Sequence, residues 1–597
     1  MYTAPVEEIA FALKAVAGLG EAMQAGETGD LTPDLLDAIL SEAGRFASEE
    51  IAPLGAVGDR QGASVQDGVV TTPEGWRDLY ASWIEGGWNA LTGPVDFGGQ
   101  GLPVALSSAV FEIWNGASMA FALGPMLTVG AVEAIAAHGS DEMKRLYLEK
   151  LVSGAWMGTM NLTEPQAGSD LSALSTRAER RDDGSYRIFG TKIYITYGEH
   201  DFTDNIVHLV LARLPDAPAG VKGISLFLVP KFLVEADGSL GVRNDVKCHS
   251  LEHKLGIHGS PTCTMIYGDG SGETDEPGAI GWVVGEENKG LACMFTMMNN
   301  ARLHVGTQGV GVAEAAFQKA LAYARERRQG RATRLGKGEA APGGMSPIIE
   351  HPDIARTLLT MKALTGAARA ITFACGHAID RAHGEANADE RRNWSERANL
   401  LTPIAKAFPT DVGVEVASLG IQVHGGMGFI EETGAAQLLR DARIAPIYEG
   451  TNGIQAIDLV LRKLPLAGGT VMARYIEELE AVIDAVRGAN HPGFGRTAEA
   501  LGAALADLGD ATAFLLGALT DRDTETALAG ATPYLRLAGL TAGAVYLAKG
   551  ALADPSRDER IALARFMAEN LLGETASLKG QVVEGAASLA AARMVLA

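Results

Sequence analysis

The sequence predicts a mainly α-helical protein with a central β-domain and a C-terminal helical bundle. Residues 1 to about 155 carry apolar side chains at helical spacing, as at Leu35, Leu36, Ile39 and Leu40. From about 156 to 290, short β-rich runs are separated by Gly, Asp and Pro. Helical spacing then returns, and the chain is rich in Ala and Leu beyond residue 464. With 597 residues the chain is too long for one hydrophobic core, so several domains are expected.

These changes in residue pattern along the chain divide it into five segments. The helical start signal Thr32-Pro33-Asp34 marks the first boundary, because it offers a capping hydroxyl followed by Pro and an acid. Loops are predicted at 336–347, rich in Gly and Pro, and at 384–396, rich in charge. The expected segments are an N-terminal extension (1–34), an N-terminal helical domain (35–155), a middle β-domain built as a barrel or as packed sheets (156–290), a second helical domain (291–463) and a C-terminal helical extension (464–597) that starts with the linker LPLAGGT.

The charge balance argues against two classes of partner. Lys and Arg number 50 and Asp and Glu number 73, which gives a net charge of −23. A field of that sign repels nucleic acid and anionic membrane, so neither is expected as a partner. An anionic substrate would need a local basic patch.

Cysteine use and apolar runs indicate a cytoplasmic protein. The four cysteines form no CxxC pair and no metal-ligand spacing, which fits a reducing compartment and predicts no metal site. No uninterrupted apolar run of about 18 residues is present, so no membrane span is expected. The N-terminus, with Glu7 and Glu8, resembles neither a signal peptide nor a transit peptide.

Two segments near the predicted β-domain have residues suited to ligand binding. In TEPQAGSD, Thr163 and Ser169 supply hydroxyls and Gly168 permits close approach of a ligand, although an ordinary polar turn has the same composition. In KIYITYG, strand alternation places Tyr194 and Thr196 on one face, where an aromatic ring and a hydroxyl could contact a flat cofactor. An ordinary half-buried strand is the alternative.

Two further segments lie in the second helical domain. QVHGGMGF clusters three glycines after Gln422, which suits either close approach to a ligand or a tight connection between helices. In RDARIAPIYEGTNGIQ, Glu449 stands between an apolar run and a turn. If it is desolvated there, its pKa would rise toward neutrality and make the carboxylate a useful base. The alternative is a surface acid near a helix start.

The order of these segments is more specific than any of them alone. TEPxAGSD, K-x-(aromatic)-IT, ERRQG, Q-x-HGGxGF and RDARIxxIYEGTNxIQ, together with GW-x(5)-P-x-x-FGGxG at 87–101, resemble the acyl-CoA dehydrogenase family over residues 35 to 463. The resemblance implies a helical domain, a β-domain and a four-helix-bundle domain, with FAD between the last two. It also implies a homodimer and reoxidation by electron-transferring flavoprotein.

The resemblance also assigns roles to individual residues. Glu449 matches the base that removes the α-proton of an acyl-CoA while a hydride leaves Cβ for FAD. Substrate contacts are implied for Ser169, Asn299 and Arg302. FAD contacts are implied for Thr163, Ser169, Tyr194, Thr196, Arg327, Gln329, Gln422, Gly425, Gly426, Thr451 and Asn452, of which Arg327, Gln329 and the 422–426 segment would reach the partner subunit's FAD.

Some positions depart from the family pattern. Tyr194 replaces the usual Trp, which reduces the stacking area, and Pro352 stands where many relatives have Gln. Some relatives carry their base just before the Arg that Arg302 matches. That position is Ala301 here, which leaves Glu449 as the family-consistent base.

The segment after residue 464, the leading segment and EHKLGIHGSPTC (252–263) are similar to large bacterial members with a C-terminal extension. These include enzymes that act on a thioether-containing acyl-CoA in dimethylsulfoniopropionate breakdown. A plain short or medium acyl chain stays open as substrate, because sulfur and methylene are similar in size. Three alternative interpretations stay open: an acyl-CoA oxidase that uses oxygen, a nitroalkane oxidase, and a non-catalytic, DNA-associated member. Glu449 in place of Asp disfavours the nitroalkane oxidase, and the net charge disfavours DNA binding.

Overall fold

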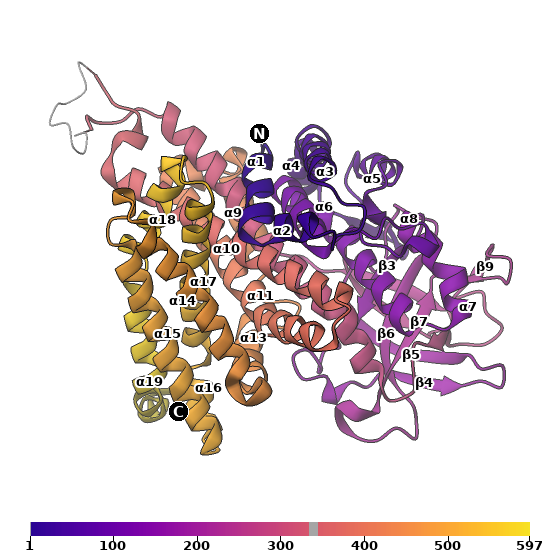
Figure 1. The fold of residues 1–597 in the computed structure, drawn as a ribbon. Coiled ribbons are helices and arrows are strands. Elements are labelled where there is room, and N and C mark those ends of the chain that lie inside the picture. The colour runs from indigo at the N-terminus through magenta and orange to yellow at the C-terminus, as the bar shows by residue number, and fades with distance from the viewer. Residues whose placement is uncertain (1, 333–343, 597) are drawn as a thin grey trace. The chain divides into compact units, whose positions relative to one another are not determined.

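A computed structural model describes residues 2–332 and 344–596, which divide into two compact units (Figure 1). The first unit comprises Met1–Arg45, Pro103–Ala117 and Arg302–Ala597, and the second comprises Phe46–Leu102 and Ser118–Ala301. Each unit thus combines segments that are distant in the sequence. The mainly helical fold with a central β region and C-terminal helices is confirmed, whereas the division into five segments stays a prediction.

Five strands of the second unit join in a ring. The order in the main sheet is β10-β11-β5-β12-β7-β6-β3, and β4 pairs with both β5 and β6. Strands β5, β12, β7, β6 and β4 are therefore linked in a closed circuit, which corresponds to the barrel alternative of the sequence analysis. The strands are β1 (Ser64–Gln66), β2 (Val69–Thr71), β3 (Met157–Asn161), β4 (Arg177–Arg180), β5 (Tyr186–Thr196), β6 (Ile206–Arg213), β7 (Ile224–Pro230), β8 (Phe232–Val234), β9 (Leu240–Arg243), β10 (Val246–Leu251), β11 (Thr262–Tyr267) and β12 (Ala279–Val283).

The core of the β-region is apolar and continuous. Ile188, Val210, Phe227 and Val229 are fully buried in it. Strand β7 is buried along its whole length, and β6 along all but its last residue, because neighbouring structure covers both of their faces.

Helices of the second unit pack around large aromatic side chains. Trp76 and Trp83 on α5 are fully buried, and each meets the ring of Phe121 edge-on, with centroids 5.7 and 5.8 Å apart. The helices of this unit are α4 (Ala52–Gln61), α5 (Trp76–Glu85), α7 (Asp141–Met143), α8 (Glu149–Ser153) and the later part of α6 (Val104–His138).

The first unit is built on a long antiparallel helix pair. Helix α10 (Pro352–Gly384) and α11 (Ala388–His424) run side by side after a three-residue connection, and Asn387 caps α11 by accepting from the N–H groups of Asp389 and Glu390. The predicted loop at 384–396 is therefore wrong from Ala388 onward, because the Asn cap and first-turn acids start a helix. The predicted loop at 336–347 lies mostly outside the described residues.

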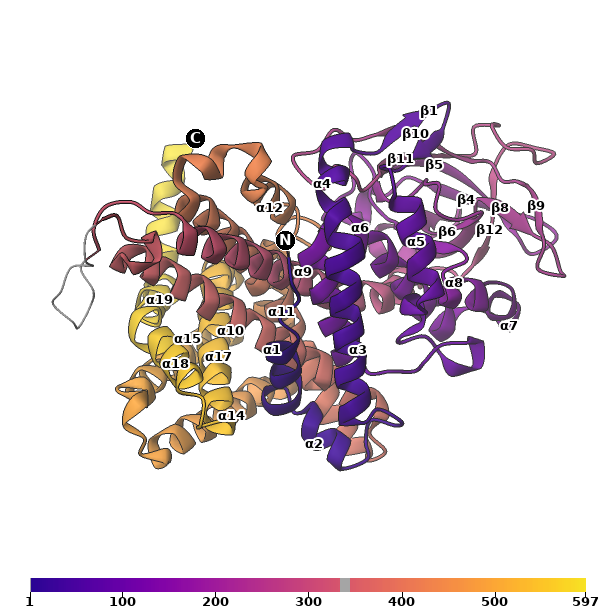
Figure 2. The ribbon, with the colours of Figure 1, turned by 90° about the horizontal axis from the view of Figure 1, so that it is seen from above.

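The C-terminal helices pack on this pair, as the orange-to-yellow helices in Figures 1 and 2 show. Helix α17 comes closest, because Gly543 leaves room for Ala367 on α10: a Cβ at 543 would lie 2.6 Å from the Ala367 Cβ. The remaining helices of the unit are α1 (Val6–Phe11), α2 (Leu19–Gln24), α3 (Pro33–Phe46), α9 (Gly290–Glu326, from Arg302 onward), α12 (Ala435–Ala442), α13 (Asn452–Asp458), α14 (Thr470–Ala489), α15 (Thr497–Thr520), α16 (Thr524–Ala529), α17 (Ala531–Ala553), α18 (Asp558–Asn570) and α19 (Glu574–Ala592).

Two of the described helices reach the length and hydropathy of a membrane span, although the sequence has no uninterrupted apolar run of that length. They are α6, with mean hydropathy 1.6, and α15, with 1.3. In α6, 89% of the apolar window is buried within the protein, as in a core helix. In α15 the share is 44%.

Candidate active site

Glu449 lies in a tight turn between α12 and α13, here called the base loop (residues 443–451). Its backbone has φ of +55°, a left-handed conformation that costs free energy for a residue with a Cβ and is typical of functional sites. Asn452 N–H donates to the Pro446 carbonyl at 2.9 Å, and the Thr451 hydroxyl caps α13 by accepting from Ile454 N–H at 3.2 Å. The neighbouring Tyr448 hydroxyl hydrogen-bonds Gln308 on α9. The turn is thus held at both ends.

The Glu449 carboxyl is half-buried and has two cations near it. Burial raises its pKa, while the charges of Arg302 and Lys406 act in the opposite direction without cancelling that increase. The local electrostatics therefore make this carboxylate a stronger base than that of an exposed glutamate. The sequence predicts a useful base at Glu449 only if this carboxyl is desolvated, and the raised pKa agrees with that condition.

The side chain of Asn452 is occupied by protein groups. Its Nδ2 donates to Asp411 Oδ1 at 2.7 Å and its Oδ1 accepts from Lys406 Nζ at 2.9 Å, both on α11. An FAD contact at Asn452, as the resemblance implies, would therefore come from its backbone. Nearby, Gln455 is fully buried and its Nε2 donates to the Glu449 and Gly450 carbonyls at 3.3 Å.

In the second unit, a buried ion pair brings the two predicted ligand-binding segments together. Lys192 on β5 donates to Glu164 Oε1 at 2.8 Å and to the Leu162 carbonyl at 2.9 Å, with both charged side chains at 2% exposure or less. Ile193 N–H donates to the Thr163 carbonyl at 2.9 Å. Thr163 is consequently held beside the strand that carries Tyr194 and Thr196.

Strand β5 is not regular at the predicted site. Tyr194 has φ of +60°, and the pairing with β11 shifts register there, which marks a bulge. The shift lies between Lys192 and Ile195, so the two-residue alternation is interrupted before Ile195, whereas Tyr194 and Thr196 flank the buried Ile195. The Tyr194 ring is 60% exposed, and Thr163 and Thr196 are half-buried, so all three have surface to offer a ligand.

The remaining predicted residues occupy other places on the two units. Gly425 and Gly426 follow α11 with no atom within 4 Å of a Cβ built on either, so the backbone there is open to a ligand. Ser169 and Asn299 are exposed in the second unit, and Gln422, Arg327 and Gln329 are exposed in the first.

Sequence reasoning missed the groups that support the base loop. Lys406, Asp411, Gln308 and Gln455 were not singled out, although each contacts the loop or the residue that follows it. One signal was available: Lys406 sits in the otherwise apolar run PIAKAF of a helix.

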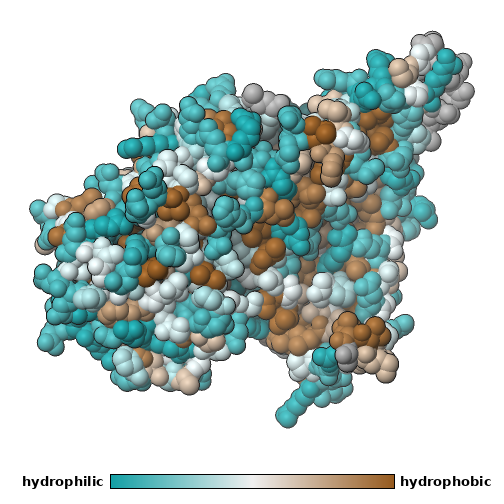
Figure 3. Space-filling view, turned by 180° about the vertical axis from the view of Figure 1, so that it is seen from behind, coloured by the Kyte–Doolittle hydropathy of each residue, from teal (hydrophilic) through white to brown (hydrophobic). Residues whose placement is uncertain are grey.

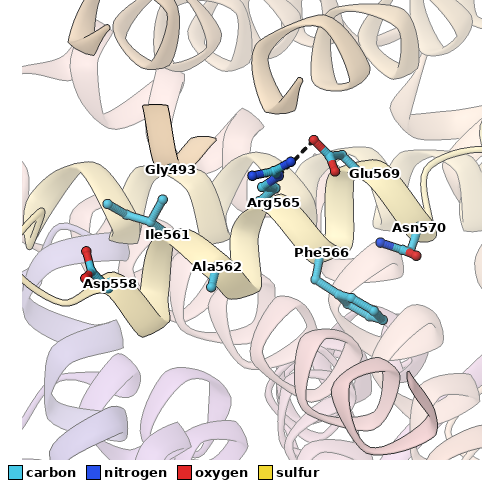
Figure 4. A pocket seen from close by; sticks show the side chains of 8 residues that line it. All are labelled: Gly493, Asp558, Ile561, Ala562, Arg565, Phe566, Glu569 and Asn570. Atoms are coloured by element: carbon cyan, nitrogen blue, oxygen red, sulfur yellow. Dashed lines mark hydrogen bonds and ion pairs between the residues drawn. The ribbon is translucent and has the colours of Figure 1, made fainter. Parts of the chain in front are cut away.

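Two hollows in the described chain lie elsewhere. One, of about 490 Å³, is an open groove along α18 whose Arg565 and Glu569 pair at 3.0 Å (Figure 4). The other, of about 340 Å³, lies among the helical segment Ala12–Val16 and α2, α10, α11, α14 and α17, and includes His377 and Lys549. Neither includes a predicted site residue.

Apolar side chains also reach the surface, which is mostly hydrophilic on the face in Figure 3. The most exposed of those near the glycine cluster is Phe429, at 87%.

Comparisons with known proteins agree with this arrangement. Family models match in chain order: the N-terminal domain of acyl-CoA dehydrogenase at 34–155, its middle domain at 159–269, its C-terminal domain at 288–464, and an acetyl-CoA dehydrogenase C-terminal-like region at 475–593. A 3-methylmercaptopropionyl-CoA dehydrogenase of Ruegeria pomeroyi is 45% identical over 99% of this chain and 100% of its own. A butyryl-CoA dehydrogenase of Syntrophomonas wolfei is 36% identical over 75% of this chain and 73% of its own.

Among solved structures, an acyl-CoA dehydrogenase of Bacillus anthracis complexed with FAD has a TM-score of 0.71 at 22% identity, covering 95% of this chain and 91% of its own. That likeness supports the fold. The sequence matches go further, because they extend over nearly all of the chain and include the base loop. The chain therefore belongs to the acyl-CoA dehydrogenase family of oxidoreductases.

Proposed function

We propose that this protein is an FAD-dependent enzyme that introduces a double bond between Cα and Cβ of an acyl-CoA thioester, with Glu449 as the base. The observation that carries the proposal is the Glu449 carboxyl: it lies in a strained turn and is desolvated enough that its pKa is raised. A carboxylate in water is far too weak a base for a thioester α-proton, and desolvation reduces that mismatch.

The residues present fit FAD. Tyr194 offers an exposed ring, Thr163 and Thr196 offer hydroxyls beside it, and Gly425 and Gly426 leave their backbone open. Together with Ser169, Thr451 and the backbone of Asn452, they are the groups that would hold the cofactor, and Arg327, Gln329 and Gln422 would reach the FAD of a partner subunit in a homodimer. When bound, FAD supplies the acceptor for the hydride that leaves Cβ.

The chain's own part in the reaction is proton transfer and orientation. Glu449 takes the α-proton, and its backbone N–H is the donor that we assign to the thioester oxygen, where negative charge develops. Ser169, Asn299 and Arg302 are the proposed substrate contacts. The base loop, fixed by its bonds to α9 and α11, holds the carboxylate in one position while the thioester is presented to it.

For the substrate, we favour 3-methylthiopropanoyl-CoA, which would give methylthioacryloyl-CoA. The support is the identity of 45%, over 99% of this chain, to the 3-methylmercaptopropionyl-CoA dehydrogenase of Ruegeria pomeroyi, whose name contains a synonym of 3-methylthiopropanoyl-CoA. A short saturated chain is the second candidate, because a butyryl-CoA dehydrogenase is 36% identical over 75% of this chain. Electron-transferring flavoprotein is the proposed acceptor; release of hydrogen peroxide with acyl-CoA in air would point to an oxidase instead.

Anaerobic titration of the purified yellow protein tests this proposal. Addition of 3-methylthiopropanoyl-CoA should bleach the flavin band, and butanoyl-CoA ranks the two substrate candidates. Glu449→Gln should keep FAD and lose bleaching by several orders of magnitude. The matched control, Glu432→Gln, removes an exposed carboxylate from the same part of the chain and should bleach normally. Bleaching of Glu449→Gln at the wild-type rate would refute the assignment of the base.

A further inference from the structure

Lys406 is a fully buried lysine in the middle of α11. A buried ammonium group is costly unless it has partners, so its presence in the apolar run PIAKAF of this helix calls for a physical reason. Its Nζ donates to Asn452 Oδ1 at 2.9 Å, and Asn452 is only three residues beyond Glu449. The lysine thus connects α11 to the end of the base loop.

Asn452 joins that bond to the loop itself. Its side chain is held by α11 through Lys406, Asp411 and Thr410, while its backbone N–H holds the Pro446 carbonyl at 2.9 Å. This series of hydrogen bonds runs from α11 through Asn452 to Pro446, and Asn452 and Pro446 lie on either side of Glu449 in the turn. Movement of Asn452 would therefore release the turn from α11.

The charges around Lys406 make it a counter-ion as well as an anchor. The positive charge of Lys406 interacts with the carboxylates of Glu449 in the base loop and of Asp411 on its own helix. Arg302 on α9 adds a second positive charge near Glu449. Further out, Asp458 and Arg462 act on Arg302, and Arg443 and Arg536 act on Asp411. Lys406 and Arg302 are the charged groups that favour the ionised form of Glu449.

We propose that Lys406 is a positioning residue for Glu449: through Asn452 it holds the base loop against α11, and its buried positive charge favours the carboxylate form that accepts the α-proton. This inference rests on the proposed role of Glu449 as base. It assigns to Asn452 the part of an anchor.

The expected signature is a displaced pH profile. Burial lowers the pKa of Lys406 to about 7, so the ammonium is mostly charged below neutral pH and mostly neutral above it. Loss of that charge leaves Arg302 as the remaining nearby cation and raises the pKa of Glu449 further. The part of the pH profile in which activity rises with pH, here called the acid limb, then moves to higher pH.

The test measures proton transfer without flavin reduction. Methylthioacetyl-CoA has acidic α-hydrogens but no β-hydrogens, so incorporation of α-deuterium from D2O by the holoenzyme, followed by mass spectrometry, reports the base alone. Lys406→Gln keeps a hydrogen-bond donor and loses the charge, Lys406→Met loses both, and Asn452→Ala loses the anchor. Lys549→Met is the control, since Lys549 is a partly buried lysine on α17, bonded to the Val16 carbonyl at 2.8 Å.

We expect exchange by Lys406→Gln to fall on the order of tenfold below wild type in the pH range where the activity of both proteins still rises with pH, and to converge with wild type at high pH. Lys406→Met should show the same displacement together with a lower rate at every pH, because it also loses the bond to Asn452. Asn452→Ala should show a lower rate at every pH without the displacement, and Lys549→Met no change. An undisplaced limb in the Lys406 variants, with FAD retained, overturns the inference. Glu449→Gln run in parallel separates the two claims: wild-type exchange by that variant would overturn the proposed base itself.

Discussion

The Glu164–Lys192 pair allows a quantitative prediction about the cofactor-binding segments. Burial raises the pKa of Glu164, but the Lys192 ammonium and hydrogen bonds from Thr176 and Ser175 outweigh it and lower the pKa to about 2. Burial lowers the pKa of Lys192 to about 8, although Glu164 acts in the opposite direction. The ordinary pKa values are 4.5 for Glu164 and 10.5 for Lys192, and each departure from them corresponds to roughly 3 kcal/mol.

The two shifts have opposite effects on stability near neutral pH. The lowered pKa of Glu164 stabilises the folded state by roughly 3 kcal/mol and the lowered pKa of Lys192 costs a similar amount, so the intact pair contributes little net free energy. Removal of one partner is different, because the other charge stays buried without its counter-ion, at a cost of about 3–5 kcal/mol. We therefore expect Lys192→Met to lower the Tm of its unit by roughly 10 °C.

The assay is a double-mutant cycle on Tm and on FAD affinity. Lys192→Met and Glu164→Gln should each lower Tm and weaken FAD binding, because the Thr163 segment loses its attachment to β5. The double variant should regain most of the loss in Tm, since no unpaired charge remains. Additive losses in the double variant would refute the reasoning.

Two further predictions concern the first unit. Asp380 accepts hydrogen bonds from the N–H groups of Val104 and Ala105 at 2.6 and 2.9 Å, yet burial raises its pKa to about 7. An acid whose folded pKa is raised stabilises the fold at low pH and loses that contribution as pH rises from about 4 to 7. The Tm of Asp380→Asn should therefore fall less than that of wild type between pH 4 and 7; parallel curves would contradict the prediction. Gly543→Val should loosen α17 from Ala367 and lower Tm by several degrees, whereas Gly517→Val on α15, where a Cβ meets no atom within 4 Å, should have a much smaller effect; equal losses would contradict it.

Local patterns in the chain were enough to predict its elements. The region predicted to be β-rich, from about 156 to 290, contains strands β3 to β12, and α3 begins at Pro33 after the predicted cap, with Leu35 N–H bonded to the Thr32 hydroxyl at 3.2 Å. The charged stretch after Gly384 was misjudged, because composition alone does not distinguish a solvated loop from a well-capped helix start. The bulge at Tyr194 was also missed, since it arises from pairing with β11.

By itself, the sequence determined the succession of helices and strands, the family and the identity of the candidate base, because these depend on residue order and local spacing. Tertiary structure decided which groups surround that base. Lys406 and Glu449 are separated by 43 residues, and only the packing of α11 against the base loop gives the carboxyl its counter-ion and its raised pKa. Desolvation and charge are set by distances in space, which periodicity along a chain does not encode.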